Sequence, residues 1–403
     1  FSSEAELASN RQRLFVDGRT LSRQRRFRDY DAEHTVVRAE LAGRFRTGTI
    51  EHRVLVGADH DAFDNDQVFL RYRPPTLAGN PSAQAGFVID VFAPQYGRFP
   101  LPAPAPQTNR LDEQRAWGVY LQDQLRLTER VQARVGLRYD DYSLDGLNRA
   151  SGARTDAGDS KLSPQAGVVF QATASVSVYA AYGEGFRPNS GVTAAGQPFD
   201  PEESRSFELG ARWASADGGL NATLVAFSME KTNILTADPQ NPGFSLPIGE
   251  AESRGVELDV AGRLPADLDL WFSYAYVDAE AAKDALDANF GLAIRAGDRL
   301  INVPEHSLYV QLSRGFALGG GTATAGVGVQ YVGERLGETA TTFELTSYTL
   351  TRLFATWAPN DRLELEARLD NAFDETWYPN SFSRLWVAAG APRRATVTAR
   401  WRW

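Results

Sequence analysis

Apolar and polar residues alternate one by one in short segments along the whole chain. The pattern is clearest at the end, where one face carries Val397, Ala399, Trp401 and Trp403 and the other carries Thr396, Thr398, Arg400 and Arg402. Segments 131–140, 206–213 and 362–370 alternate in the same way. A repeat of two residues places neighbouring side chains on opposite faces of an extended strand. The chain is therefore predicted to consist of β-strands with one apolar and one polar face.

The connections between these strands alternate between short and long. About sixteen strands are expected, and tight turns are predicted at positions such as 47–48, 128–129 and 360–361. Long loops are expected over 61–115, 142–161, 184–203, 230–251, 279–304, 334–346 and 371–393. Short turns at one end and long loops at the other are typical of an antiparallel up-and-down meander.

Such a meander forms either stacked soluble sandwiches or a transmembrane barrel. Charges occupy the polar face of almost every strand, which suits a wet lumen better than a thin sandwich. Aromatic residues lie near the ends of the apolar face, as at the two interfaces of a membrane: Trp117, Trp213, Tyr274, Tyr276, Trp357, Trp401 and Trp403. The favoured fold is an all-β transmembrane barrel. His52 and Asp123 interrupt the apolar face, so a bulge or an interfacial position is expected there.

Composition excludes several other classes of protein. No stretch reaches the roughly 18 apolar residues of a membrane-spanning helix, and aromatic residues make up 11% of the chain, which argues against disorder. The net charge of −9 argues against nucleic acid as a partner. There is no cysteine, no Gly-x-Ser-x-Gly and no His-Glu-x-x-His, so an enzyme is not expected.

Eleven short motifs, in order along the chain, carry a family resemblance. They are HRVLVGAD (52–59), DVFAPQYG (90–97), GVYLQDQ (118–124), GLRYD (136–140), YAAYGEGFRPN (179–189), FDPE (199–202), KTNILT (231–236), SRGVELD (253–259), NVPEH (302–306), DNAFD (370–374) and GAPR (390–393). Together they resemble the TonB-dependent outer-membrane receptors, in particular ferric siderophore receptors of the hydroxamate (ferrichrome) type. Locally, the Asn and Asp residues of 371–374 predict a turn with unusual backbone angles.

The resemblance implies a barrel of about twenty-two strands, with short periplasmic turns and long extracellular loops. Residues 1–403 are then expected to be one incomplete barrel domain, because a plug domain and a TonB box have no counterpart. The chain begins at Phe1 without a signal peptide, as a fragment or processed product does. Trp403 is expected to act as the C-terminal signal for the barrel-assembly machinery, where the family more often has Phe.

The function implied by the resemblance is uptake of ferric siderophores through the cell outer membrane, with energy supplied through TonB in the intact protein. The expected partners are the siderophore, TonB and outer-membrane lipid. No cofactor is expected, since the ferric siderophore is cargo. The alternatives are a passive porin-like or structural barrel, and a receptor of the same family for another cargo such as cobalamin.

Aromatic residues in the long loops are the candidate ligand contacts, because rings pack around the apolar shell of a siderophore. The six candidates are Phe92, Tyr96, Phe186, Trp377, Phe382 and Trp386. Positions matching Phe92, Phe186 and Phe382 lie near the ligand in the hydroxamate receptors that the chain resembles. No metal site is expected. The acidic cluster Asp59, Asp61, Asp64 and Asp66 lacks the Gly and terminal Glu of an EF-hand calcium loop, and a solvated loop is favoured there.

Overall fold

The computed structural model describes residues 2–8 (backbone only), 17–72, 74, 87–97, 103–241, 244–287 and 291–403. Within these residues, 17 strands form one large sheet, and the one helical segment is the short turn Pro265–Asp267. No helix in the described part of the chain is long and apolar enough to cross a membrane.

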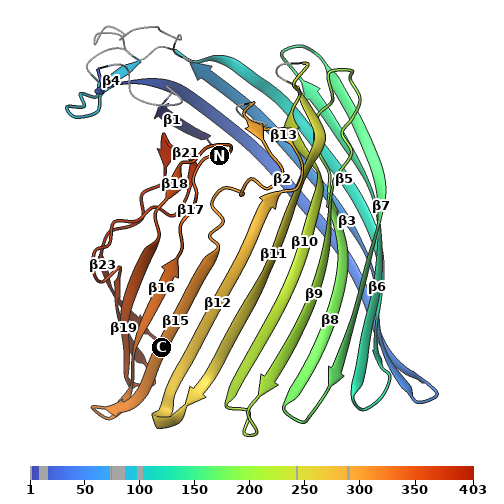
Figure 1. Ribbon diagram of the computed structural model, residues 1–403, viewed down its shortest axis with the longest axis vertical. Helices are drawn as coiled ribbons and strands as arrows, with labels where there is room; N and C mark the ends of the chain where they lie inside the picture. Colours follow the sequence, from blue (N-terminus) through green and yellow to red (C-terminus); the bar gives the residue numbers. More distant parts are fainter. Residues whose placement is uncertain are drawn as a thin grey trace.

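The large sheet is an antiparallel meander that curls around a central lumen (Figure 1). Each strand pairs with the next long strand along the chain. The long strands are β1 (Ser2–Ala8), β2 (Thr20–Thr47), β3 (Ile50–Tyr72), β5 (Ala105–Arg126), β6 (Val131–Asn148), β7 (Arg154–Gln171), β8 (Val176–Arg187), β9 (Glu202–Ala214), β10 (Leu220–Ala237), β11 (Ser245–Leu264), β12 (Leu268–Ala281), β15 (His306–Leu318), β16 (Gly321–Val332), β19 (Tyr348–Asn360), β20 (Leu363–Asp370) and β23 (Arg394–Trp401).

Several short strands lie in the long connections. β4 (Val88–Asp90) pairs with the beginning of β2 and is the seventeenth strand of the sheet. Three two-stranded ladders stand apart from it: β13 (Ala285–Leu286) with β14 (Ala293–Ile294), β17 (Arg335–Leu336) with β18 (Glu344–Leu345), and β21 (Ser381–Ser383) with β22 (Trp386–Val387). The predicted all-β up-and-down architecture is confirmed, with sixteen strands in the meander.

The strands of the first half are longer than the sequence pattern predicted. β2 has 28 residues and β3 has 23, so 61–72 and 105–115 continue the sheet instead of forming a loop. Likewise β6 extends to Asn148 and β7 begins at Arg154, inside the expected loop 142–161. β8 extends to Arg187, so the beginning of the expected loop 184–203 is also strand. Beyond the lipid both faces of a strand meet water, so the alternation that marks a lipid-crossing segment disappears although the ladder continues.

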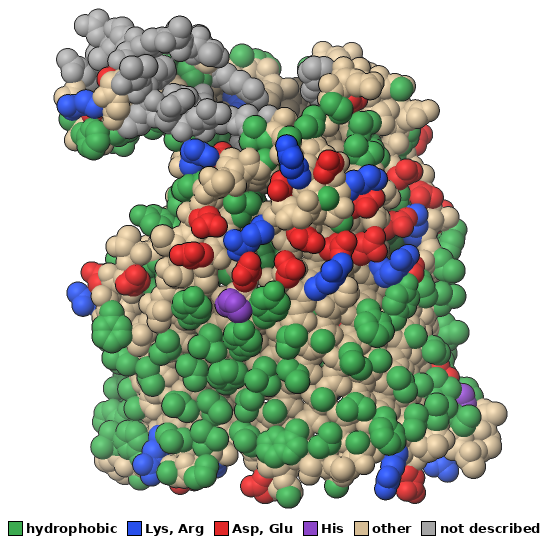
Figure 2. All heavy atoms as spheres, viewed as in Figure 1, with side chains coloured by type: hydrophobic (Ala, Val, Ile, Leu, Met, Phe, Trp, Pro, Cys, Tyr) green, Lys and Arg blue, Asp and Glu red, His purple; other side chains and the backbone are tan. Residues whose placement is uncertain are grey.

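The apolar face of the sheet points away from the lumen. Val397 is 78% exposed and Leu209 is 56% exposed, and large exposed apolar residues occur on nearly every long strand. Figure 2 shows these side chains as a broad apolar band, with acidic and basic side chains gathered in a belt above it. The opposite face carries ion pairs such as Arg400 with Glu364 (2.5 Å). Apolar residues therefore face outward and charged residues face the lumen, as predicted.

His52 and Asp123 accommodate each other on the apolar face without a bulge. The β3–β5 register runs unbroken past both residues, with its one shift between Phe69 and Leu70. His52 Nδ1 lies 2.6 Å from Asp123 Oδ2, and the ring of Phe45 stacks on His52 at 4.6 Å. Of the two predicted alternatives, the structure therefore has the interfacial position, next to the start of β3 at Ile50, and not the bulge. The contact gives each polar group one partner close to the short turns, where the chain leaves the apolar band, while His52 Nε2 and Asp123 Oδ1 stay buried without a hydrogen bond to a described residue.

The sheet has two edges in the described part of the chain. β23 pairs with β20 and β1 pairs with β2, and no described residue of β23 pairs with β1 or β2. The two termini lie on either side of the resulting seam (Figure 1).

Candidate functional site

A buried arginine organises the loops above β16, β19 and β20. The side chain of Arg335 is 1% exposed, and its guanidinium donates hydrogen bonds to the carbonyl oxygens of Gly333, Thr346, Tyr378 and Pro379. The same guanidinium lies over the ring of Tyr348, 5.3 Å from its centroid. Burial lowers the pKa of Arg335. One cation thus joins loop 333–347 to loop 371–393 through backbone carbonyls alone.

Two asparagines in left-handed backbone conformations fix the same loops. Asn302 (φ 62°) accepts a hydrogen bond from the Ser381 N–H (2.9 Å) and donates one to the Ser381 carbonyl (2.8 Å). Asn371 (φ 48°) donates to the carbonyls of Glu375 and Ala391 and accepts from the Glu375 N–H. The predicted turn with unusual backbone angles at 371–374 is confirmed, since Asp374 also has a positive φ of 60°.

Phe382 and Trp386 come together on the hairpin that these contacts position. Their rings stack with centroids 5.2 Å apart, and Phe382 remains 38% exposed. The guanidinium of Arg26, on β2, lies 5.3 Å from the Trp386 ring. Because β2 is on the other side of the seam, this contact brings the last long loop against the first long strand at the rim. Of the six predicted aromatic contacts, these two form one exposed cluster.

Trp377 packs downward, away from that cluster. Its ring lies 4.9 Å from Tyr348, and its indole N–H donates to the Ala391 carbonyl (3.0 Å). A Cβ at Gly390 would stand 2.1 Å from the Trp377 ring, so this close approach requires glycine. Trp377 therefore packs against the beginning of β19, where it lines a cavity in the lumen wall, instead of joining Phe382.

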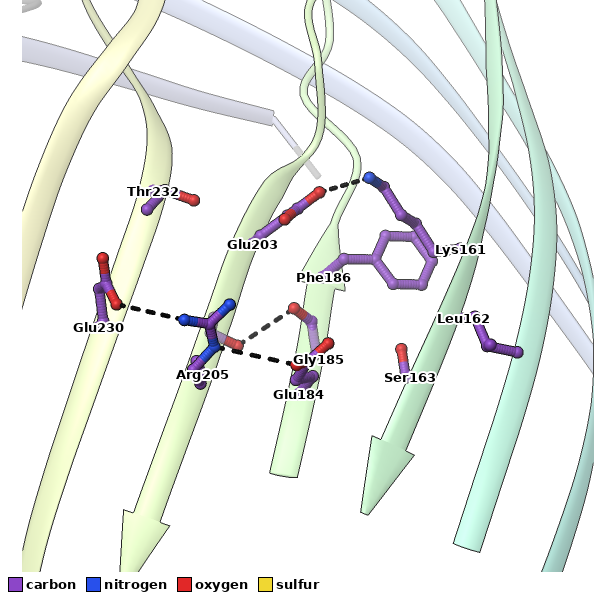
Figure 3. Close-up of a pocket in the computed structure, with 11 residues that line it drawn as sticks. Lys161, Leu162, Ser163, Glu184, Gly185, Phe186, Glu203, Arg205, Glu230 and Thr232 are labelled. Carbon is purple, nitrogen blue, oxygen red and sulfur yellow. Dashed lines mark hydrogen bonds and ion pairs between the residues drawn. The ribbon is translucent and has the colours of Figure 1, made fainter. Parts of the chain in front are cut away.

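Phe186 lies in the barrel wall where two strands separate. The β7–β8 ladder ends at Gln165 and Gly183, and above this point the Phe186 ring stacks on the buried Tyr142 at 5.7 Å. Burial raises the pKa of Tyr142 to about 12, so this ring stays a neutral phenol. Beside Phe186, a cavity of about 290 Å³ is crossed by an ion pair from Lys161 to Glu203 (Figure 3).

Phe92 and Tyr96 lie on an exposed rim loop. They are 73% and 75% exposed. Asp90 shapes this loop, because its carboxylate accepts hydrogen bonds from the Phe92 and Ala93 N–H groups and pairs with Arg19 at 2.7 Å. These contacts lower the pKa of Asp90. Within the described part of the chain, no ring contact or hydrogen bond joins Phe92 or Tyr96 to the other four aromatic candidates. A ligand contact by any of the six stays a prediction.

The acidic cluster on β3 is neutralised by basic partners instead of forming a solvated loop. Asp59 pairs with Arg138 (2.8 Å), Asp61 with His34 (2.6 Å), Asp64 with Arg115 (2.5 Å) and Asp66 with Arg149 (2.5 Å). Among the residues that the structure describes, no group of three or more acidic, His or Cys residues is arranged to hold a metal.

Three lumen-facing carboxylates in β9 and β11 have no such partner. Glu208, Glu257 and Asp259 alternate with the outward-facing Leu209, Val256 and Leu258, and within the described residues they form no ion pair or side-chain hydrogen bond. The alternating pattern predicts that all three face the lumen, but it does not predict that they lack basic partners. A polar face specifies which residues face the lumen, but strand register decides which charges meet.

Sequence reasoning also missed residues that position the site. Arg335 lies in a loop with no periodic pattern, and its four carbonyl partners come from positions 2 to 44 residues away. Asn302 stood in a recognised motif, but its link to Ser381 spans 79 residues. Neither partnership has a local sequence signal.

Comparison with known proteins supports the barrel assignment. The profile of the family "TonB dependent receptor-like, beta-barrel" matches residues 3–372. The chain is 36% identical to the metal-pseudopaline receptor of Pseudomonas aeruginosa, over 97% of this chain and 54% of that protein. It is 28% identical to the ferrichrome outer membrane transporter/phage receptor of Escherichia coli, over 96% of the chain and 50% of that protein.

Solved structures share the fold. The siderophore receptor PiuA of Acinetobacter baumannii matches with a TM-score of 0.77 and 23% identity, over 94% of this chain and 56% of that one. The ferric preacinetobactin receptor of the same species matches with a TM-score of 0.78 and 20% identity, over 99% and 58%. The chain thus spans about half the length of the curated relatives it matches. Its sequence and its sheet place the chain in the TonB-dependent receptor-like β-barrel family.

Proposed function

We propose that this chain is the barrel of an outer-membrane receptor that imports ferric siderophores, driven through TonB. The observation that carries the proposal is the meander of sixteen strands, apolar outside and charged inside, with a fixed aromatic cluster at its rim. The relatives are named as receptors for metal-pseudopaline and ferrichrome. The family is one of transporters and receptors, and the apolar band suits the outer membrane, where such barrels are found.

Energy coupling requires a domain that fills the lumen, and the lumen wall has an acidic surface that such a domain could contact. Glu208, Glu257 and Asp259 face inward without partners among the described residues. Carboxylates that face a filled lumen need basic partners to offset their desolvation. We therefore expect a basic face on a plug domain, and with it the TonB contact. The outward apolar band and Trp403 support lipid and the barrel-assembly machinery as further partners.

Ligand binding by the intact receptor tests this function. The purified protein is titrated with a ferric hydroxamate, a ferric catecholate and cobalamin while tryptophan fluorescence is followed. We expect saturable quenching by at least one ferric chelate, because Trp386 stands in the rim cluster and Trp377 lies below it. Replacing Phe382 by Ala should weaken binding about tenfold, since a stacked ring is lost.

The matched control is Phe373→Ala, because Phe373 lies in the same loop and is exposed without belonging to the cluster. Quenching by cobalamin alone would identify a receptor of the same family for another cargo. Absence of any saturable response would favour a passive, porin-like barrel.

A further inference from the structure

The lumen wall below Trp377 contains a cavity of about 240 Å³. It lies where β15, β16, β19, β20 and β23 approach their long loops, and Tyr309, Gln330 and Leu350 line its sides. Trp377 and Pro392 close its top. The Trp377 ring is held by the Ala391 carbonyl and by its close approach to Gly390, so this wall is rigid.

Positive charge exceeds negative charge in this cavity. Its lining holds three guanidiniums (Arg352, Arg368 and Arg394) but a single carboxylate, Asp370. Asp370 Oδ1 lies 2.8 Å from Arg352 Nε, while its Oδ2 lies 2.9 Å from Arg368 Nε and 3.8 Å from Arg394 Nη2. One carboxylate cannot balance three cations. Lower on the same wall, by contrast, Arg400 stands between Glu364 and Glu366.

The guanidiniums also retain unused hydrogen-bond donors. Arg368 Nε and Asp370 Oδ2 are both buried and, although they lie 2.9 Å apart, neither makes a hydrogen bond with adequate geometry, so this donor remains open to a second acceptor. Of the three arginines, Arg352 alone donates a hydrogen bond to a described residue, and it does so through Nε. Guanidinium donors form a planar fork that matches the two oxygens of a carboxylate. The excess of positive charge and the unused guanidinium N–H donors together favour the binding of an anion in this cavity.

We propose that this cavity binds a carboxylate arm of the metal chelate, so that the cargo is an anionic, carboxylate-bearing chelate. The cavity is too small for a whole chelate but accommodates one arm, while the Phe382–Trp386 cluster stands on the loop above it. The Trp377 and Tyr309 rings supply apolar walls for the methylene groups of that arm. This inference rests on the proposed function and specifies its substrate.

The test compares two iron chelates of opposite charge on the intact receptor. Ferric citrate is an anionic carboxylate chelate, and ferrioxamine B is a cationic hydroxamate chelate. For Arg352→Gln and Arg394→Gln we expect the affinity for ferric citrate to fall about tenfold. The affinity for ferrioxamine B should not fall. Arg400→Gln is the matched control, because it removes an arginine from the same wall outside the cavity, and it should leave both affinities unchanged.

Four results would overturn the inference. Unchanged ferric citrate affinity in both variants would show that the cavity does not contact the cargo. An equal fall for both chelates would show that the arginines act by holding the wall together. Binding of ferrioxamine B without binding of ferric citrate would refute this substrate class and leave the proposed function intact, whereas binding of no ferric chelate would refute both.

Discussion

Replacing Leu209 by arginine is expected to lower the free energy of unfolding in lipid by about 2–4 kcal/mol. Leu209 is 56% exposed on the outer face of β9, between Ala180 of β8 and Ala226 of β10. If that face contacts acyl chains, the new guanidinium must be drawn out of water. Urea-induced unfolding of the intact receptor in phospholipid vesicles measures the difference.

The matched control is Val225→Arg. Val225 lies on the neighbouring strand β10, one residue before the cross-strand partner of Leu209, and it faces the lumen opposite Glu257. An arginine there stays on the polar, lumen-facing side beside the Glu257 carboxylate and never enters lipid, so we expect a change below about 1 kcal/mol. Equal costs for the two substitutions, or a larger cost for Val225→Arg, would contradict the assignment of the two faces.

Replacing Arg335 by alanine is expected to destabilise the rim loops by about 3 kcal/mol or more, because four carbonyl groups lose one charged donor in a buried site. The loss falls on loops 333–347 and 371–393, since Arg335 joins them. Hydrogen exchange of the receptor, followed by mass spectrometry, should show faster exchange in both loops. The strands of the lipid-facing band should remain protected, because their ladders do not depend on Arg335.

The substitution Arg335→Lys distinguishes the effect of the positive charge at this site from the effect of the planar guanidinium geometry. Lysine keeps the positive charge but cannot present a planar fork to four carbonyls, so we expect intermediate exchange rates. Siderophore affinity should follow the same order as loop protection, because the loop carries Phe382 and Trp386. Unaltered exchange in the alanine variant would mean that Asn302 and Asn371 suffice to hold the loops.

Alternation predicted the strands and their two faces, and the charged polar face together with the aromatic residues at the strand ends favoured the barrel over a sandwich. The predicted count of about sixteen agrees with the structure because two differences cancel: β1 was not predicted, and the single strand β2 was predicted as two strands, 19–30 and 33–46. The pattern failed in segments such as 61–72, where the alternation ends but strand pairing continues. It predicted a loop there, whereas the structure has a strand. At His52 and Asp123 it identified the two polar residues, but their mutual pairing depends on the register between β3 and β5.

The site was predictable only in part. Aromatic residues in long loops could be named from the sequence, and Phe382 with Trp386 do form a cluster. The separation of Trp377 from that cluster depends on Gly390 and Tyr348, which are 13 and 29 residues away. The arginine cavity gathers side chains from β19, β20 and β23 around one carboxylate. Such a gathering follows from register and loop packing, which no local pattern specifies.

The claim that the apolar face of each strand contacts lipid and the polar face the lumen is tested most directly by a nitroxide scan of 206–213 in the intact receptor in lipid. Residues 1–403 contain no cysteine, so a cysteine introduced at any of these positions is the single labelling site within them. Labels at Phe207, Leu209, Ala211 and Trp213 should be reached by dissolved oxygen from the bilayer. Labels at Ser206, Glu208, Gly210 and Arg212 should be reached by a water-soluble nickel complex. If oxygen reached the second set of labels and the nickel complex the first, or if accessibility did not alternate along the segment, the assignment of the apolar face to lipid would be contradicted.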